Sequence, residues 1–272
     1  MKRKPLGAIG AVSLAIVLFM AITADVIAPY DPVVQDIPSR LQAPSLTHWL
    51  GTDEFGRDEW SRILFGARIS LYVGIMSSII GAVGGTILGI FSAYAGGKTD
   101  LIIQRFVDTM IGFPSLILAM VLVATLGASL NNVVIAISAG FLPRLSRVAR
   151  SQALSIKEQE FILAAQSIGA ADTRILFLHM VPNCIAPVIV LTTAFLGTAI
   201  VTEASLSFLG LGVPPPAPSW GGMLNWEMRR FMEEAPYLVL APGLALTLAV
   251  FGFNLFGDAL RDVLDPRLRG GR

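Results

Sequence analysis

Long apolar runs alternate with shorter polar segments along almost the whole chain. Six of these runs approach the roughly 20 residues that an α-helix needs to cross a bilayer. The pattern predicts six transmembrane helices, at about 6–28, 70–94, 106–126, 132–149, 184–206 and 235–255. We therefore expect an all-α integral membrane protein.

Two of the six runs need a further argument. The first follows the basic start Met1-Lys-Arg-Lys4, as a signal peptide would, but it is too long for one and no small-residue cleavage pattern follows. We expect an uncleaved anchor helix. The fourth run is apolar only as far as Pro143, and the three arginines that follow must lie on a helical extension in water or among lipid headgroups. The chain then divides into an anchor (1–28), an extracytoplasmic segment (29–69) and a five-helix core (70–272).

The distribution of basic residues predicts the orientation. With six crossings both termini lie on one side, and that side carries fourteen of the Lys and Arg residues against six on the other. Basic residues accumulate on the cytoplasmic side of membrane proteins. We therefore expect both termini, and the segment of about 150–183 between the fourth and fifth helices, to be cytoplasmic.

Composition supports a membrane protein and excludes several other classes. The chain is 54% hydrophobic and 14% charged, with a mean hydropathy of +0.70, which a soluble domain does not reach. The net charge of +1 gives no general attraction to nucleic acid. Cys184 is the single cysteine and fits a packed, unreactive thiol. His48 and His179 lack a ligand cluster around them, so we expect no metal site.

Small residues mark a close helix contact in the second run. Gly81, Gly85 and Gly89 recur every four residues and share one helical face, which allows a neighbouring backbone to approach closely. This face fits a pore wall and a subunit contact equally well. In the third run, Pro114 predicts a kink.

The segment between the fourth and fifth runs contains a short amphipathic helix. Phe161, Ala164, Ala165 and Ile168 fall at i, i+3, i+4 and i+7, which predicts one apolar stripe, and Gly169 predicts the end of the helix. Such a helix can insert into a groove of another protein, or it can pack on its own bundle. The apolar pattern alone does not decide between docking in a partner and packing on its own bundle.

Several motifs in one order carry a family resemblance. Glu160-Phe-Ile-Leu-Ala-Ala165, followed by Gly169 and Pro182, resembles the cytoplasmic EAA loop of ATP-binding cassette (ABC) importer permeases. The resemblance to the second permease subunit of dipeptide, oligopeptide and nickel importers extends over nearly the whole chain, through His48-Trp-Leu-Gly-Thr-Asp-Glu-Phe-Gly-Arg-Asp58, Gly66-Ala-Arg-Ile-Ser-Leu71, Ser207-Phe-Leu-Gly-Leu-Gly212, Trp220-Gly221 and Asn254-Leu-Phe-Gly-Asp-Ala-Leu-Arg-Asp262.

The resemblance implies a role and partners for this chain. Its coupling helix would sit in a cleft of a cytoplasmic ATPase subunit through Glu160, Ala164, Ala165 and Gly169, and the apolar stripe adds Phe161 and Ile168. One departure is Leu163, which occupies the position of the glutamate in the general permease pattern. The family implies a heterodimer with a sister permease, two ATPase subunits that bind ATP and Mg, and an extracytoplasmic substrate-binding protein. This chain itself would need no cofactor and catalyse no reaction.

Three features could indicate chemistry in the chain itself. Ser92-Ala-Tyr-Ala-Gly-Gly-Lys-Thr99 is close to a phosphate-binding loop, but Ser92 replaces its first glycine and the segment leaves a membrane helix. No Gly-x-Ser-x-Gly hydrolase motif occurs in the sequence. Glu203, with Thr198 and Thr202 nearby, is an ionisable residue inside a span. It would line the substrate path or stabilise an outer gate, or it would be an interfacial acid that reaches water.

The sequence thus predicts a permease subunit of an ATP-driven importer of di- or oligopeptides in the cell membrane. Import of nickel or another small solute is the alternative within the same family. An ion-driven secondary transporter is a different class and predicts inverted internal repeats, which the sequence does not show. A structural scaffold without a pore is a third class.

Overall fold

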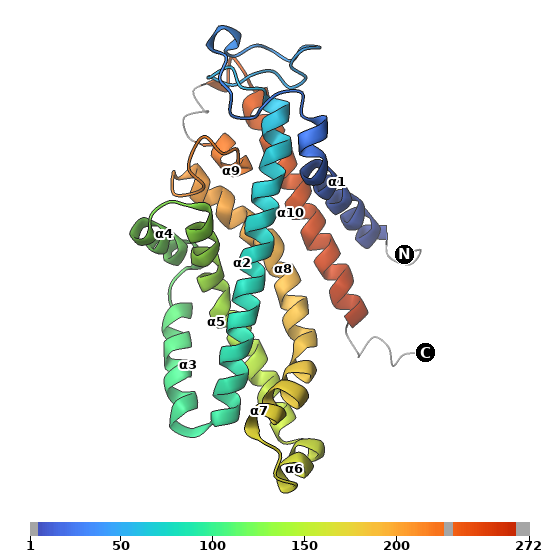
Figure 1. The fold of residues 1–272 in the computed structure, drawn as a ribbon, viewed down its shortest axis with the longest axis vertical. Coiled ribbons are helices and arrows are strands. Elements are labelled where there is room, and N and C mark those ends of the chain that lie inside the picture. The colour runs from blue at the N-terminus through green and yellow to red at the C-terminus, as the bar shows by residue number, and fades with distance from the viewer. Residues whose placement is uncertain (1–4, 226–230, 265–272) are drawn as a thin grey trace.

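The computed structural model describes residues 5–225 and 231–264, and within these ranges every regular element is a helix (Figure 1). In chain order the elements are α1 (Pro5–Ile27), η1 (Ile37–Ser39), α2 (Glu59–Ala95), α3 (Gly97–Ile111), α4 (Ser115–Leu126), α5 (Leu130–Lys157), α6 (Glu160–Ser167), α7 (Asp172–Arg174), η2 (Ile175–Met180), α8 (Val181–Phe208), α9 (Trp220–Met223) and α10 (Tyr237–Leu264).

The long helices form an elongated bundle with two distinct ends. Helices α2 and α8 run along its long axis, and α5 and α10 pack on them (Figure 1). The irregular segment 28–58 and α9 lie toward one end, which we call the α9 end, whereas α6 and α7 form the opposite, α6 end. With 37 residues, α2 is about 55 Å long and reaches from one end to the other.

Four helical stretches are long and apolar enough to cross a membrane: Leu6–Ile27, Glu59–Ala95, Asp172–Phe208 and Tyr237–Val263. They contain the first, second, fifth and sixth predicted spans. The fourth predicted span lies inside α5, which continues as a helix through Pro143 to Lys157 but does not reach the same apolar character. The all-helical class is therefore confirmed, while six crossings stay a prediction.

The third predicted span is broken in the structure. Helices α3 and α4 meet at an angle of 93°, so one kinked helix over 106–126 is wrong. The break lies at Gly112-Phe113-Pro114. Proline lacks an amide donor and disfavours helical backbone at the residue before it, which explains why α3 ends at Ile111 and α4 starts only at Ser115. The bent pair would supply a fifth crossing if it counts as one span.

The glycine face of α2 packs against α5 of the same chain. A Cβ atom added to Gly85 would lie 2.7 Å from the carbonyl oxygen of Leu142, and one added to Gly89 would lie 2.3 Å from that of Ser146. Neither distance leaves room for a methyl group. The close approach that the glycines predict therefore occurs inside this chain, and the face is buried rather than exposed to a partner or a pore.

The first and last helices pack against each other. A Cβ atom at Gly7 of α1 would lie 2.7 Å from Cβ of Ala259, and one at Gly10 the same distance from Cβ of Leu255. The starting end of α1 thus lies beside the final part of α10. This places the two ends of the described chain on the same side of the bundle (Figure 1).

Helix α2 starts earlier than the apolar pattern predicts. It begins at Glu59, so the last part of the segment 29–69 is helical. Asp58 caps this helix because its carboxylate accepts hydrogen bonds from the amide of Ser61 at 2.8 Å and from its hydroxyl at 2.7 Å. The first turns carry the charged residues Glu59, Arg62 and Arg68, which is why hydropathy alone placed the start near residue 70.

Candidate functional site

The helix that resembles a coupling helix is a separate element at the α6 end. Its inner face consists of Ile162 and Ala165, which are buried in the main apolar core together with Ile175 and Met180. Its outer face carries Phe161, which is 45% exposed. These contacts anchor α6 to its own bundle on one side only.

The outer face of α6 is apolar and uncovered in this chain. Phe161, Ala164 and Ile168 are all exposed and fall at i, i+3 and i+7. Leu163 beside them is 52% exposed and Ile168 is 86% exposed. We call Phe161, Leu163, Ala164 and Ile168 the α6 outer face.

Gly169 ends α6 as the sequence predicts. It has φ of +75°, a conformation that a side chain disfavours. Its amide donates to the carbonyl of Gln166, and the amide of Ala170 donates to the carbonyl of Ala165, both at 3.0 Å. This pair of bonds is the Schellman arrangement, which satisfies carbonyls at the helix end.

The predicted apolar stripe is divided between two faces. Phe161, Ala164 and Ile168 point outward, whereas Ala165 packs inward with Ile162. Ile162 anchors the helix, and the sequence did not identify it. Ile162 and Ala165 are three residues apart, as are Phe161 and Ala164, so spacing alone does not tell which pair is buried. Glu160 starts the helix.

Two ion pairs join α5 to α3 near α6. Arg150 forms a two-pronged pair with Asp100, with nitrogen to oxygen distances of 2.7 and 2.5 Å. Arg147 pairs with Asp108 at 2.6 Å. Asp100 also accepts a hydrogen bond from Ser92, the residue that replaces the first glycine of the phosphate-loop-like segment. A carboxylate therefore occupies that segment, which opposes phosphate binding there.

The α6 side is also tied to the last turn of α2. Lys157, the final residue of α5, donates to the carbonyls of Ala93 and Tyr94 at 3.2 and 2.8 Å. The hydroxyl of Tyr94 donates to Asp172, the first residue of α7, at 2.5 Å. We call the pairs Arg147–Asp108, Arg150–Asp100, Lys157–α2 and Tyr94–Asp172 the α6-end clasp. The helix before α6 is therefore held against α2 and α3, and the helix after α6 is held against α2.

The chain leaves α6 through a continuous helical stretch. Helix α7, the π-helical turn η2 and α8 follow one another without a gap from Asp172 to Phe208. The ring of Phe161 lies beside that of His179 in η2, with 6.4 Å between ring centroids. Displacement of α6 would therefore act directly on the base of α8.

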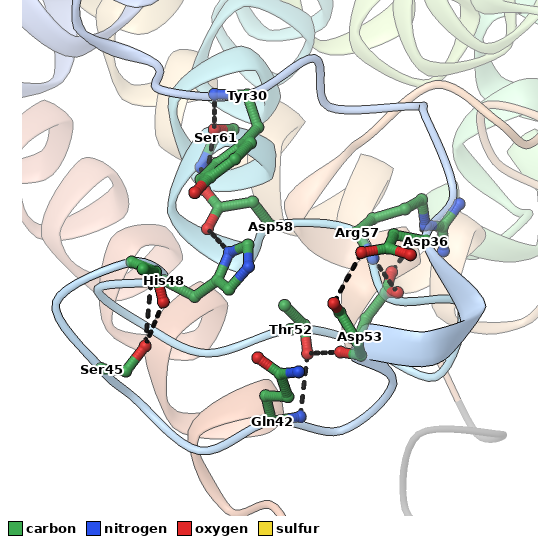
Figure 2. A network of polar contacts seen from close by, with 12 residues as sticks. Tyr30, Asp36, Gln42, Ser45, His48, Thr52, Asp53, Arg57, Asp58 and Ser61 are labelled. Atoms are coloured by element: carbon green, nitrogen blue, oxygen red, sulfur yellow. Dashed lines mark hydrogen bonds and ion pairs between the residues drawn. The ribbon is translucent and has the colours of Figure 1, made fainter.

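The motif at 48–58 forms a polar network with the preceding segment and the start of α2 at the α9 end (Figure 2). The carboxylate of Asp53 accepts from the amide of Arg57 at 3.0 Å and from its Nε at 2.6 Å. His48 contacts Asp58 through Nδ1 at 2.9 Å and stacks on Tyr30. These polar groups are used to hold the segment on the start of α2.

Helix α9 fills a notch between α2 and α8. Trp220 is fully buried, and its indole nitrogen donates to the carbonyl of Ile63 at 3.1 Å. Gly66 leaves room for the indole ring, and a Cβ atom at Gly221 would lie 2.3 Å from Cα of Ala204. The residues of the Trp220-Gly221 motif are thus those that allow this fit.

Glu203 is buried in α8 close to this notch, so the expectation of an acid that reaches water is wrong. Its Oε1 accepts from the hydroxyl of Ser207 at 2.7 Å, and the hydroxyl of Ser219 lies 3.4 Å from that of Ser207. Thr198 and Thr202 do not join this group, because their hydroxyls bond to carbonyls of their own helix. The structure does not bring the three predicted path residues together.

A partly open cavity of about 360 Å³ lies at the α9 end. One wall comes from residues 53–62 and the other from residues 207–225, which are far apart in sequence. Its lining contains Ser207 and Ser219 of the Glu203 group and the three prolines 214–216. Neither the apolar pattern nor the motif spacing predicts that these two segments form one cavity.

Fold and site together define an all-helical, multi-pass membrane protein with an anchored but uncovered apolar helix at one end. Residues 85–270 match the family described as the inner membrane component of binding-protein-dependent transport systems, and residues 1–44 match the N-terminal transmembrane domain of oligopeptide transport permease C. The chain belongs to this family of inner-membrane transport components.

Similar proteins cover nearly the whole chain. The dipeptide transport system permease protein DppC of Alkalihalophilus pseudofirmus is 43% identical over 99% of this chain and 88% of its own length. The glutathione transport system permease protein GsiD of Escherichia coli is 43% identical over 99% and 89%. A putative peptide transport system permease protein of Brucella suis is 41% identical over 96% and 88%.

A solved structure shows the same fold. The chain resembles the MetNI methionine ABC transporter in an inward-facing conformation, with a TM-score of 0.60 and 16% identity, over 75% of this chain and 96% of that one. The helical arrangement is therefore that of an ABC permease.

Proposed function

We propose that this chain is a transmembrane permease subunit of an ATP-driven peptide importer, and that α6 is the helix through which ATPase subunits drive it. The observation that carries this proposal is the α6 outer face. Four apolar or small side chains are presented on a helix whose opposite face is anchored in the core. A small exposed apolar surface of this kind is typical of a helix that docks in a partner's groove.

The rest of the machine is inferred from the family. The chain would form half of the translocation path beside a sister permease, with two cytoplasmic ATP-binding subunits and an extracytoplasmic substrate-binding protein. ATP and Mg would be bound by the ATPase subunits, and this chain would have no catalytic role. Membrane lipid would surround the bundle, which would cross the inner membrane six times.

The α6-end clasp gives the mechanism a physical path. Closure of the ATPase pair on ATP moves the grooves that hold α6. The clasp joins α5, which precedes α6, to α2 and α3, and it joins α7, which follows α6, to α2; η2 continues from α7 into α8, so these helices would shift with α6. Such coupling requires only that ATP binding and the docked α6 favour the same one of two conformations of the transporter.

The docking role is tested by placing a charge on the α6 outer face. In the reconstituted transporter, Ala164→Glu should abolish copurification of the ATPase subunits or peptide-stimulated ATP hydrolysis, because it would bury a carboxylate in an apolar contact. Ala164→Ser is the matched control, since it keeps the small size without the charge, and should retain both activities. Normal transport by Ala164→Glu, with the variant folded, would contradict the proposal.

The orientation can be measured independently. Cys184 is buried, so cysteines introduced elsewhere can be labelled selectively. Leu46→Cys at the α9 end and Ile168→Cys at the α6 end are placed at sites that are 96% and 86% exposed. In cells that lack the ATPase subunits, which would otherwise cover Ile168, an impermeant maleimide should label Leu46→Cys while the cells are intact and Ile168→Cys only after permeabilisation. The reverse result would place α6, and with it the termini, on the outside.

Substrate and energy source are separated by transport assays. Competition for uptake between a dipeptide and nickel distinguishes peptide import from the alternative of nickel or small-solute import. Uptake that requires ATP and the partner subunits supports the importer. Uptake by this chain alone, driven by an ion gradient, would identify a secondary transporter instead.

A further inference from the structure

The cavity at the α9 end contains a carboxylate with an unused hydrogen-bond acceptor. Glu59 lines the cavity and is 2% exposed, and its Oε1 has no hydrogen-bond partner among the described residues. A buried carboxylate oxygen without a partner is unfavourable, and native proteins rarely keep one unless it is used.

The other charged groups in the lining are already engaged. The described lining contains three acidic and two basic side chains. Asp53 binds Arg57 at 2.6 Å and lies 3.5 Å from Arg62, and Arg62 also donates to the carbonyl of Pro32 at 2.9 Å. Glu54 has an interaction partner as well. Among the charged side chains of the lining, Glu59 is therefore the one whose Oε1, itself fully buried, still lacks a hydrogen bond.

The chemistry of the site favours a primary ammonium group. One free carboxylate oxygen suits a compact cation with N–H donors, whereas a divalent metal ion needs several oxygen ligands. The lining also contains Ser207 and Ser219, whose hydroxyls bond to Glu203 and to each other. The volume of about 360 Å³ is at the lower end of the range of small-ligand pockets, which is roughly 300–1,000 Å³.

We propose that this cavity binds the amino-terminal ammonium group of the transported peptide, with Glu59 as its acceptor. The inference rests on the proposed function, which supplies the peptide and places the α9 end on the side from which it arrives. It adds a specific role to the cavity: this subunit itself holds the peptide before the path opens.

Direct binding to the full chain in lipid nanodiscs tests the proposal without the substrate-binding protein. The probes are dialanine, N-acetyl-dialanine and methylammonium. Wild type should bind dialanine, methylammonium should compete for the same site, and N-acetyl-dialanine should not bind. Glu59→Gln should weaken dialanine binding at least about tenfold, because a charge-assisted hydrogen bond is lost.

The matched control is Glu234→Gln, which makes the same change at an exposed residue that does not line the cavity. It should bind dialanine like wild type. Thermal unfolding separates binding from folding: Glu59→Gln should unfold at a temperature no lower than Glu234→Gln, since a neutral amide of the same size replaces a carboxyl group whose burial disfavours its charged form. A large drop together with weaker binding would assign Glu59 a structural role and overturn the proposal.

Several other results would also overturn it. Equal binding of N-acetyl-dialanine, unchanged binding by Glu59→Gln, or no binding by wild type would each do so. Loss of dialanine binding when the sister permease is present would show that the partner subunit occupies or closes the cavity. ATP-dependent peptide uptake by wild type would still support the importer in all of these cases, so the two proposals fail separately.

Discussion

The contact between α2 and α5 offers a sharp test of the packing. In Gly89→Ala the new Cβ atom would lie 2.3 Å from the carbonyl oxygen of Ser146 and 2.9 Å from the amide nitrogen of Arg150. Ordinary contact begins near 3.4 Å, so the two backbones must separate locally by about 1.1 Å. Both neighbours are backbone atoms and cannot be relieved by a change of rotamer.

The magnitude follows from two opposing effects. Overpacking of this kind costs up to about 3 kcal/mol. Alanine is favoured over glycine within a helix by about 1 kcal/mol, which offsets part of that cost. We therefore expect Gly89→Ala to destabilise the protein by about 2 kcal/mol, and to weaken the pair that Arg150 forms with Asp100.

A control is available in another membrane helix. Gly243 in α10 has no atom within 4 Å of an added Cβ, so Gly243→Ala should leave stability unchanged or raise it by up to about 1 kcal/mol. Both variants can be unfolded in mixed detergent micelles and followed by tryptophan fluorescence. If Gly89→Ala proves as stable as Gly243→Ala, the close α2–α5 approach is refuted.

Three further experiments probe other contacts. Trp220→Phe removes a buried hydrogen bond and part of a fully packed ring and should cost about 1–3 kcal/mol in the same unfolding assay. An unchanged midpoint would contradict the docking of α9. Asp58→Ala removes the cap of α2 and should cost about 1 kcal/mol, with faster amide exchange in the first turn; unaltered exchange would count against the cap. The side chains of Arg150 and Asp100 are 29% and 17% exposed, so a double-mutant cycle on this pair should give a coupling energy of about 1 kcal/mol that falls as salt is added. A coupling energy of zero at low salt would show that this pair is not part of the clasp.

Apolar runs were sufficient to predict most of the helices. Four of the six predicted spans lie in helical stretches apolar enough to cross a membrane, because burial in lipid requires a long apolar run whatever the neighbouring contacts are. The break of the third run was only partly predictable. Pro114 signals an interruption, but the 93° turn depends also on how α3 and α4 each pack on α5.

The candidate site was less predictable because it depends on contacts between distant segments. On α6, Phe161 and Ala164 have the same spacing as Ile162 and Ala165, so periodicity cannot tell which pair is buried. The burial of Glu203 depends on Ser207 and on the way the segment before α9 folds back. The family resemblance did identify the α6 segment and the Trp220-Gly221 motif, whose positions the structure explains.

The length of α2 has a consequence for how the two ends of the molecule communicate. One unbroken helix has its first residue, Glu59, in the cavity at the α9 end and its last turn held by Lys157. A stiff rod of this kind cannot tilt at one end and stay still at the other. Substitutions at opposite ends, about 50 Å apart, should therefore show non-additive effects on transport, although residues so distant are normally independent.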